Sequence, residues 1–155
     1  MLGREQAGDL RFNLSHTAEE VLIGVTRGRE VGVDIETLER RGDFGGVARR
    51  VFTARELAEL EGLGGTDAAA WRRAFLRGWT RKEAFLKDLG TGLLREPREL
   101  FVGLRERGPG PPWPPDDAAL GAWGCLADVW APPSFTAAVA AQGAGWVVVP
   151  CGTLP

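Results

Sequence analysis

Three segments near the start of the chain alternate between apolar and polar residues. The alternation covers residues 10–15, 20–26 and 31–36, and the first segment ends at Ser15-His16-Thr17. A period of two is typical of β-strands that bury one face. The connections between the segments are short, and short connections join antiparallel neighbours. We therefore predict an antiparallel meander of three strands.

The pattern becomes helical after a polar loop at residues 37–46. We predict a short helix at residues 47–52 and a second helix that begins with Thr53 and Glu56 as a capping box and ends at the glycines near residue 64. The longest helix runs from a cap at Thr66-Asp67 to about Leu89, where Gly90 and Gly92 end it. Its apolar residues recur close to helical spacing: Trp71, Ala74, Phe75, Trp79, Phe85, Leu86 and Leu89.

The last third of the chain contains further short strand candidates. We expect strands at residues 100–104, 123–129, 135–141 and 146–149, with a Pro/Gly loop at residues 108–115. The alanine-rich run at residues 137–141 has helix propensity, but it is short and lies between Pro133 and Gly143, so we assign it to a strand. The pattern predicts an α+β fold, with an antiparallel sheet packed against the long helix, in a single domain over residues 1–155.

Composition and charge narrow the class of protein. A chain of 155 residues can bury a core without disulfides or metals. Its net charge of −2 and pI near 5.5 argue against nucleic acid as a partner. Two cysteines without metal-site spacing suggest a reducing compartment. No stretch resembles a membrane span or a signal peptide. We therefore expect a cytoplasmic protein that has no membrane partner.

The third predicted strand carries two carboxylates on one face. Val31, Val33 and Ile35 suit a core, whereas Asp34 and Glu36 point the other way. Gly32 on the same face leaves room for a close approach. Neighbouring like charges repel each other, so either water solvates this pair or a cation holds it together.

The long helix can bring a third carboxylate to this pair. Trp79, Glu83 and Lys87 are spaced i, i+4 and i+8 and share one helix face. Three carboxylates without a His/Cys set fit a hard cation such as Mg²⁺, which usually keeps substrate phosphates among its ligands. Lys87 would then face phosphate. His16, the only histidine, can bind phosphate or transfer a proton.

Each feature also has a simpler interpretation. The carboxylate pair can be a solvated strand face, and Glu83 with Lys87 can be an ordinary helix ion pair. His16 can cap a turn, and Trp79 can belong to the core. The order and the combination of these residues favour a site.

Three segments together resemble the 4′-phosphopantetheinyl transferase superfamily. They are Phe12-Asn13-Leu14-Ser15-His16-Thr17, then Val31-Gly32-Val33-Asp34-Ile35-Glu36, then the segment from Trp79 to Gly92 with the core Trp79-Thr80-Arg81-Lys82-Glu83-Ala84-Phe85-Leu86-Lys87. The order, with Ser-His first, resembles the Sfp type. Three motifs in register over about 80 residues are more specific than a single glycine motif.

The resemblance implies an enzyme, a holo-[acyl-carrier-protein] synthase or 4′-phosphopantetheinyl transferase. Such an enzyme moves the phosphopantetheine arm of coenzyme A, its substrate, onto a serine of an apo acyl or peptidyl carrier protein and releases adenosine 3′,5′-bisphosphate. The resemblance assigns Mg²⁺ and the coenzyme A pyrophosphate to Asp34, Glu36 and Glu83. It assigns contacts with the phosphates to Ser15, His16, Lys82 and Lys87.

The resemblance also implies catalytic roles. Glu83 would be the base that acts on the carrier serine, directly or through a metal-bound water, and Glu36 is the alternative base. Lys87 would neutralise or protonate the leaving phosphate. Trp79 would orient the helix.

The chain departs from the Sfp pattern because its motifs begin at residue 12. It resembles the C-terminal half of a two-half enzyme, and the N-terminal pseudo-repeat is apparently absent. We therefore expect either a homo-oligomer or a missing N-terminal half. A non-catalytic half-domain that binds coenzyme A or a carrier protein is the alternative, and another Mg²⁺-dependent phosphotransferase or hydrolase is a third.

Overall fold

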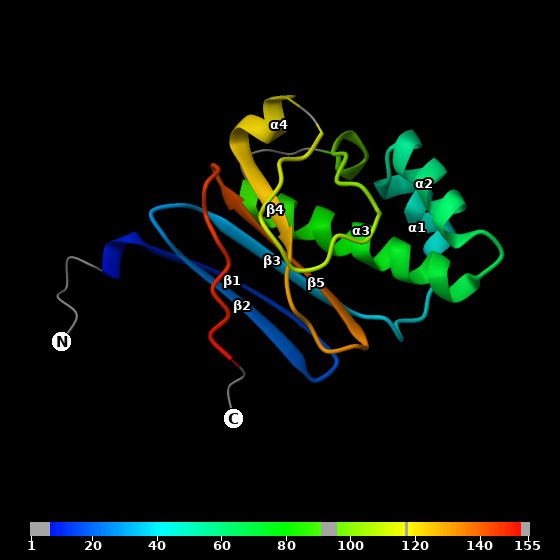
Figure 1. Ribbon diagram of the computed structural model, residues 1–155, viewed down its shortest axis with the longest axis horizontal. Coiled ribbons are helices and arrows are strands. Elements are labelled where there is room, and N and C mark those ends of the chain that lie inside the picture. Colours follow the sequence, from blue (N-terminus) through cyan, green and yellow to red (C-terminus); the bar gives the residue numbers. More distant parts are fainter. Residues whose placement is uncertain (1–6, 91–95, 117, 153–155) are drawn as a thin grey trace.

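The computed structural model describes residues 7–90, 96–116 and 118–152 and shows an α+β fold (Figure 1). Its elements in chain order are η1 (Ala7–Asp9), β1 (Leu10–Thr17), β2 (Glu20–Arg27), β3 (Val31–Thr37), α1 (Phe44–Val51), α2 (Ala54–Gly64), α3 (Ala68–Leu89), η2 (Pro97–Glu99), α4 (Ala118–Trp123), β4 (Gly124–Asp128) and β5 (Phe135–Gln142). Among the described residues, no helix is both long enough and apolar enough to cross a membrane.

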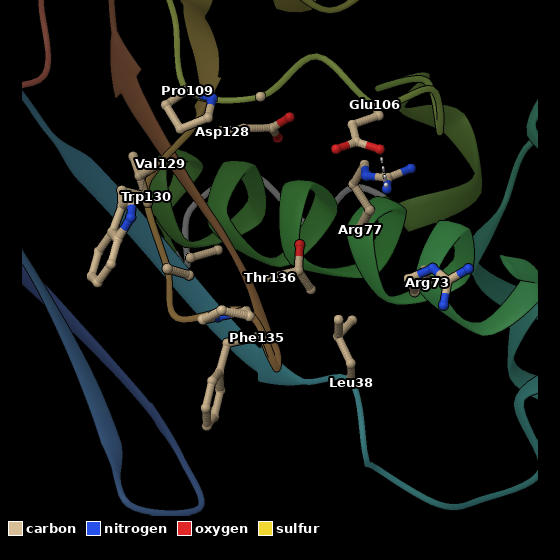
Figure 2. A pocket seen from close by; sticks show the side chains of 14 residues that line it. Leu38, Arg73, Arg77, Glu106, Pro109, Asp128, Val129, Trp130, Phe135 and Thr136 are labelled. Atoms are coloured by element: carbon tan, nitrogen blue, oxygen red, sulfur yellow. Dashed lines mark ion pairs between the residues drawn. The ribbon is translucent and has the colours of Figure 1, made fainter. Parts of the chain in front are cut away.

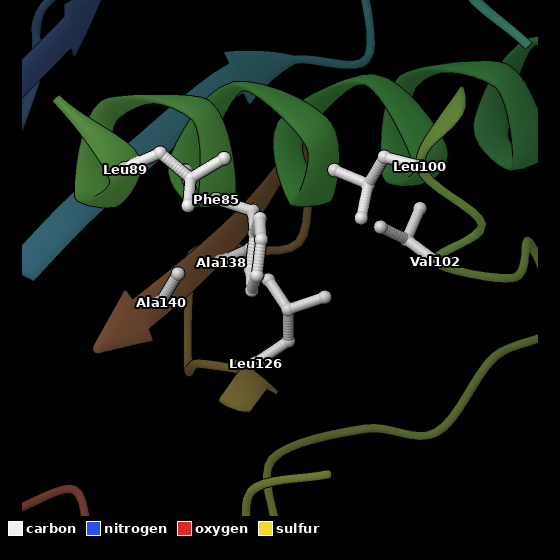
Figure 3. Packing of buried hydrophobic residues seen from close by; sticks show 8 residues of the cluster. Phe85, Leu89, Leu100, Val102, Leu126, Ala138 and Ala140 are labelled. Atoms are coloured by element: carbon white, nitrogen blue, oxygen red, sulfur yellow. The ribbon is translucent and has the colours of Figure 1, made fainter. Parts of the chain in front are cut away.

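An antiparallel sheet in the order β3-β5-β4 packs one face against α3. The core between them contains Phe85 of α3, Leu126 of β4, and Ala138 and Ala140 of β5 (Figure 3). The small side chains of β5 let α3 lie close to the sheet, which explains why an alanine-rich run serves as a strand here. The prediction of a strand at residues 135–141 is confirmed.

The first two strands form an antiparallel hairpin of their own, and the predicted three-strand meander is wrong. β3 pairs with β5 and makes no backbone ladder with β2. The side chains of β1 cover the free edge of β3 instead. The N–H of Val33 donates to Asn13 Oδ1 at 3.0 Å, and the N–H of Ile35 donates to Ser15 Oγ at 3.3 Å.

The predicted strand at residues 100–104 is also wrong. This segment is irregular because its backbone is paired with side chains of α2. The N–H of Val102 donates to Glu56 Oε1, and the N–H of Leu104 donates to Glu59 Oε2, each at 2.8 Å. These carboxylates satisfy the buried backbone where a neighbouring strand otherwise would.

The predicted strand at residues 146–149 is irregular as well. The indole of Trp146 donates to the carbonyls of Ala141 and Gly143, each at 3.2 Å, and so holds the chain in a turn after β5. Val147 and Val149, which follow this turn, are exposed.

Helix positions follow the sequence more closely. The capping box of Thr53 and Glu56 is present at α2, and Asp67 caps α3, which ends at Leu89 as predicted. Gly92 lies outside the described residues. α1 begins at Phe44, inside the predicted loop, because the Asp43 side chain accepts the N–H of Gly46 at 3.1 Å and caps the helix.

Gly32 allows the backbone of β3 to touch the backbone of α3. A Cβ at this position would lie 2.0 Å from the carbonyl oxygen of Ala84 and 2.5 Å from the nitrogen of Asp88. Neither backbone atom can move without shifting the helix. The absence of a side chain at Gly32 therefore fixes the distance between α3 and the strand that carries Asp34 and Glu36.

We predict that Gly32→Ala destabilises the fold by about 3 kcal/mol or more, because the added methyl group overlaps helix backbone. Urea unfolding followed by circular dichroism measures this change. Gly62→Ala is the matched control, since a Cβ there meets nothing within 4 Å and α2 gains up to about 1 kcal/mol of helix propensity. Equal stability of the Gly32→Ala variant and the wild type would contradict the prediction.

Candidate functional site at the β3–α3 contact

Asp34 is the centre of the predicted site. It is buried on the α3-facing side of β3, where the Ser15 hydroxyl donates to its Oδ1 at 2.9 Å and Lys87 Nζ donates to the same oxygen at 2.8 Å. Lys87 Nζ also donates to the carbonyl of Val33 at 3.0 Å. The structure therefore brings Ser15, Asp34 and Lys87 together from β1, β3 and α3.

Glu36 lies two residues further along the same face. Its Oε1 accepts the indole N–H of Trp79 at 3.2 Å and also bonds to Arg40 Nη1. Trp79 therefore orients a carboxylate in addition to packing beside Phe75 of α3. Arg40 belongs to the site although we did not predict it there, and its only sequence signal is its position four residues after Glu36.

Glu83 faces the same two carboxylates from α3. Burial raises the pKa of Glu83, the negative charge of Asp34 raises it further, and the positive charge of Lys87 opposes the shift. Burial is likewise the main reason that the pKa values of Asp34 and Glu36 lie above their ordinary values. Three carboxylates thus share a poorly solvated region, where the charge of Asp34 makes ionisation of Glu36 and Glu83 less favourable.

The donor chemistry of these residues fits a hard divalent cation. Asp34 Oδ2 is buried and has no hydrogen-bond partner among the described residues, and an unpaired buried carboxylate oxygen is a natural metal ligand. In the same described part of the chain, no three acidic, histidine or cysteine side chains converge closely enough to hold a metal in their present rotamers. Lys87 and Arg40 currently provide the opposing positive charges for Asp34 and Glu36.

The structure separates the two residues of the predicted Ser15-His16 pair. Successive side chains of a strand point to opposite faces, and Ser15 points inward to Asp34. His16 is exposed and lies on the other face of the hairpin, opposite Val21 of β2. Within this chain, Ser15 reaches the carboxylates and His16 does not.

Lys82 is also apart from the carboxylates, although it precedes Glu83 directly. Its Nζ pairs with Glu56 Oε2 at 2.7 Å and donates to the carbonyls of Pro97 and Leu100, with only 1% of the side chain exposed. Neighbouring helix residues point about 100° apart, so Lys82 faces α2 while Glu83 faces β3. The expectation that Lys82 meets phosphate does not agree with this placement, and Lys82 joins α3 to α2 instead.

A pocket of about 320 Å³ lies elsewhere, between the first half of α3 and the start of β5 (Figure 2). Its walls include Arg73, Arg77, Asp128 and Phe135, and none of its described lining residues belongs to the carboxylate cluster. The charged groups in it are largely engaged, since Arg77 donates to the carbonyl of Leu104 and Asp128 accepts two hydrogen bonds from Arg81. The candidate site is thus a cluster of largely buried charged side chains at the β3–α3 contact and is separate from this pocket.

Comparison with known proteins identifies the family of the chain. Residues 30–112 match the model of the 4′-phosphopantetheinyl transferase superfamily, a stretch that contains β3 and the whole of α3. The chain belongs to this superfamily. The matched stretch includes Asp34, Glu36, Glu83 and Lys87, whereas Ser15 precedes it.

The relatives are similar over different shares of their length. The 4′-phosphopantetheinyl transferase HetI of Nostoc sp. is 34% identical over 137 residues, which cover 88% of this chain and 54% of HetI. AcpT of Salmonella typhimurium, also a 4′-phosphopantetheinyl transferase, is 40% identical over 81 residues, or 52% of this chain and 41% of AcpT. The chain therefore spans about half the length of the relatives it matches.

A solved structure, the holo-[acyl-carrier-protein] synthase AcpS of Thermotoga maritima, aligns with 75% of this chain and 64% of its own. Its sequence identity is 20% and its TM-score is 0.49.

Asp88 follows Lys87 on α3 and is a buried carboxyl outside the cluster. Burial raises its pKa from 3.8 to about 7. The Trp123 indole is turned toward it, but neither the Asp88 oxygens nor Trp123 Nε1 complete a hydrogen bond of normal geometry with any described residue. Ionisation of Asp88 therefore opposes folding.

We predict that Asp88→Asn stabilises the protein at pH 8 and has little effect near pH 4. The unfolded chain ionises Asp88 near pH 3.8 and the folded chain only near pH 7, so wild-type stability falls across this window. The charge costs on the order of 2–4 kcal/mol above pH 7. Urea unfolding at several pH values measures the difference, with exposed Asp116→Asn as the control. The same gain at pH 4 and pH 8 would contradict this assignment.

Proposed function

We propose that the protein transfers the 4′-phosphopantetheine arm of coenzyme A to a serine of an apo acyl or peptidyl carrier protein. One observation carries the proposal: Asp34, Glu36 and Glu83 have raised pKa values, and Lys87 forms an ion pair with Asp34. All four residues lie on the segment that matches the superfamily model. The Sfp type is part of the proposal, supported by the position of Ser15 on a strand before the matched stretch. The free thiols of Cys125 and Cys151 agree with a cytoplasmic location.

The proposed reaction is a phosphoryl transfer. The carrier serine oxygen forms a bond to the phosphorus that bears pantetheine, and the bond from that phosphorus to the bridging oxygen breaks. The serine proton passes to a base, and adenosine 3′,5′-bisphosphate leaves with the bridging oxygen. Such reactions depend mainly on positioning and charge neutralisation, which a set of fixed charged side chains supplies.

We assign the base to Glu83. Its raised pKa brings it closer to neutral pH, where a carboxylate accepts a proton more effectively, and the Glu83 carboxylate makes no hydrogen bond with a described side chain. Glu36 is the alternative base, but Trp79 and Arg40 already occupy its Oε1.

Lys87 is the proposed group that neutralises the leaving phosphate. It is partly exposed and hydrogen-bonds to both Asp34 and the Val33 carbonyl, so its ammonium group is held at the edge of the cluster. We propose a phosphate contact for Ser15 as well, which requires its hydroxyl to exchange the bond to Asp34. His16 can contribute only from the outer face of the hairpin, and we leave Lys82 out of the phosphate contacts.

Asp34, Glu36 and Glu83 are the residues that would hold Mg²⁺. When bound, Mg²⁺ would supply positive charge against the pyrophosphate of coenzyme A. The unpartnered Asp34 Oδ2 supports this assignment. For Glu36 to bind Mg²⁺ through Oε1, its bond to Arg40 would have to be replaced by a bond to the metal. Arg40 would then be free to meet an anionic substrate group.

The alternative function is binding of coenzyme A or a carrier protein without transfer. The outward position of His16 favours it, because one expected phosphate contact is missing from the cluster. An assay of transfer to an apo carrier protein distinguishes the two functions.

We predict that Glu83→Gln lowers the transfer rate at least 100-fold, a typical contribution of a general base, and leaves the fold intact. Mass spectrometry of an apo carrier protein incubated with coenzyme A and Mg²⁺ measures the added arm. Glu61→Gln, on the exposed side of α2, should transfer at the wild-type rate. Wild-type transfer by Glu83→Gln would remove Glu83 from the mechanism, and the absence of transfer by the folded wild type would favour the binding function.

We predict that millimolar Mg²⁺ raises the thermal unfolding midpoint of the wild type by a few degrees. A ligand that binds only the folded state, at a concentration well above its Kd, stabilises that state by about this much. Asp34→Asn should abolish this increase, because it removes the unpartnered oxygen from the proposed ligand set. Asp116→Asn should retain it. Differential scanning calorimetry measures all three proteins, and an equal response of Asp34→Asn and the wild type would exclude Asp34 as a ligand.

A further inference from the structure

Arg40 supplies positive charge to all three carboxylates of the candidate site. It forms an ion pair with Glu36, and its charge opposes the rise in the pKa values of Asp34, Glu36 and Glu83. Lys87 does the same from α3. Because the effect of a charge falls with distance, the Arg40 guanidinium lies near the three carboxylates at once, as a shared cation would.

The two cations are held differently. Lys87 Nζ has two partners, Asp34 Oδ1 at 2.8 Å and the Val33 carbonyl at 3.0 Å, and its side chain is 30% exposed. The Arg40 side chain is 47% exposed, and among the described residues its only hydrogen bond is to Glu36 Oε1. Of the two cations, Arg40 is therefore the one that can leave its carboxylate at the lower cost.

Backbone hydrogen bonds fix the turn that carries Arg40. The N–H of Arg40 donates to the carbonyl of Thr37 at 3.2 Å. The N–H of Leu38 donates to the carbonyl of Ser134 at 2.8 Å, which ties the turn to the residue before β5. A long side chain on a fixed turn can change partners while its backbone stays in place. Arg40 therefore remains within reach of the carboxylates after its bond to Glu36 is broken.

Charge balance favours such an exchange. The proposed Mg²⁺, together with Arg40 and Lys87, would bring more positive charge to the cluster than three ionised carboxylates can match. Mg²⁺ and Lys87 alone match the three carboxylates. Excess charge in a poorly solvated region is costly, and the cation and Arg40 also compete for Glu36 Oε1. Metal binding should therefore release Arg40.

We infer that Arg40 exchanges partners on binding: it leaves Glu36 Oε1 when a divalent cation takes that oxygen, and its guanidinium then binds the pyrophosphate of coenzyme A. A guanidinium group suits this role because its planar donors match two phosphate oxygens at once. Arg40 thus competes with the cation before the substrate binds and holds the substrate afterwards. The inference rests on the metal site and the substrate of the proposed function.

The exchange predicts that Arg40→Gln changes two affinities in opposite directions. The affinity for Mg²⁺ alone should rise about tenfold, since the competing guanidinium is gone, and the affinity for coenzyme A at saturating Mg²⁺ should fall about tenfold. Isothermal titration calorimetry of the full chain measures both dissociation constants. A residue that merely stabilised the turn would weaken both affinities when replaced.

Arg41→Gln is the matched control, because Arg41 is the next residue and is exposed. It should bind both ligands like the wild type. Arg40→Lys keeps the charge without the planar donors, so it should bind Mg²⁺ like the wild type and coenzyme A more weakly. Circular dichroism checks that each variant is folded.

The outcomes separate this inference from the proposed function. If the wild type binds Mg²⁺ and coenzyme A, but the two affinities of Arg40→Gln are unchanged or move in the same direction, the inference is overturned and the proposed function stands. The same holds if Arg41→Gln reproduces the opposite changes. A wild type that fails to bind Mg²⁺, or fails to bind coenzyme A, would overturn the proposed site and the inference with it.

Discussion

Backbone contact between β3 and α3 determines the positions of the three carboxylates and of Lys87 in the candidate site. Gly32 lets the helix lie against the strand, and the residues on the facing sides then have little room. Asp34 and Glu36 follow Gly32 on the strand, and Glu83 and Lys87 approach them from the helix. A wider separation would admit water between them, which would return their pKa values toward normal and weaken the fixed contacts of Lys87.

This contact also explains how one helix serves two purposes. Glu83 and Lys87 face the strand, while Lys82, on the adjacent face, forms a buried ion pair with Glu56 and bonds to the segment after α3. Removing one partner of a buried ion pair is strongly destabilising, because it leaves the other charge buried and unpaired. The pair therefore helps fix the orientation of α3 about its axis. Glu56 in turn caps α2 and accepts the N–H of Val102, so the setting of α3 depends on residues far from β3.

The sequence predicted the fold class, the boundaries of α1, α2 and α3 and the strands at β1, β2, β3, β4 and β5 to within a few residues, but it missed α4. Periodicity and capping residues are local signals, and these elements depend mainly on local interactions. The strand partners were harder to predict from the sequence, since β3 pairs with β5, which lies about 100 residues further along the chain. Motif spacing predicted that Asp34, Glu36, Glu83, Lys87 and Ser15 lie near one another, and the structure places them in one region. It could not tell which neighbour in Ser15-His16 or Lys82-Glu83 faces the cluster, because that choice is set by the direction of the strand and the rotation of the helix.

The side chains of Asn13 and Ser15 have a consequence for the behaviour of the chain in concentrated solution. β3 is the edge of its sheet, and an open edge offers N–H and C=O groups to any passing extended segment. By taking the N–H groups of Val33 and Ile35, the two polar residues close this edge without adding a strand. The strand that carries the candidate acidic residues is thereby protected from intermolecular β-sheet growth, and Ser15 serves both this protection and the site.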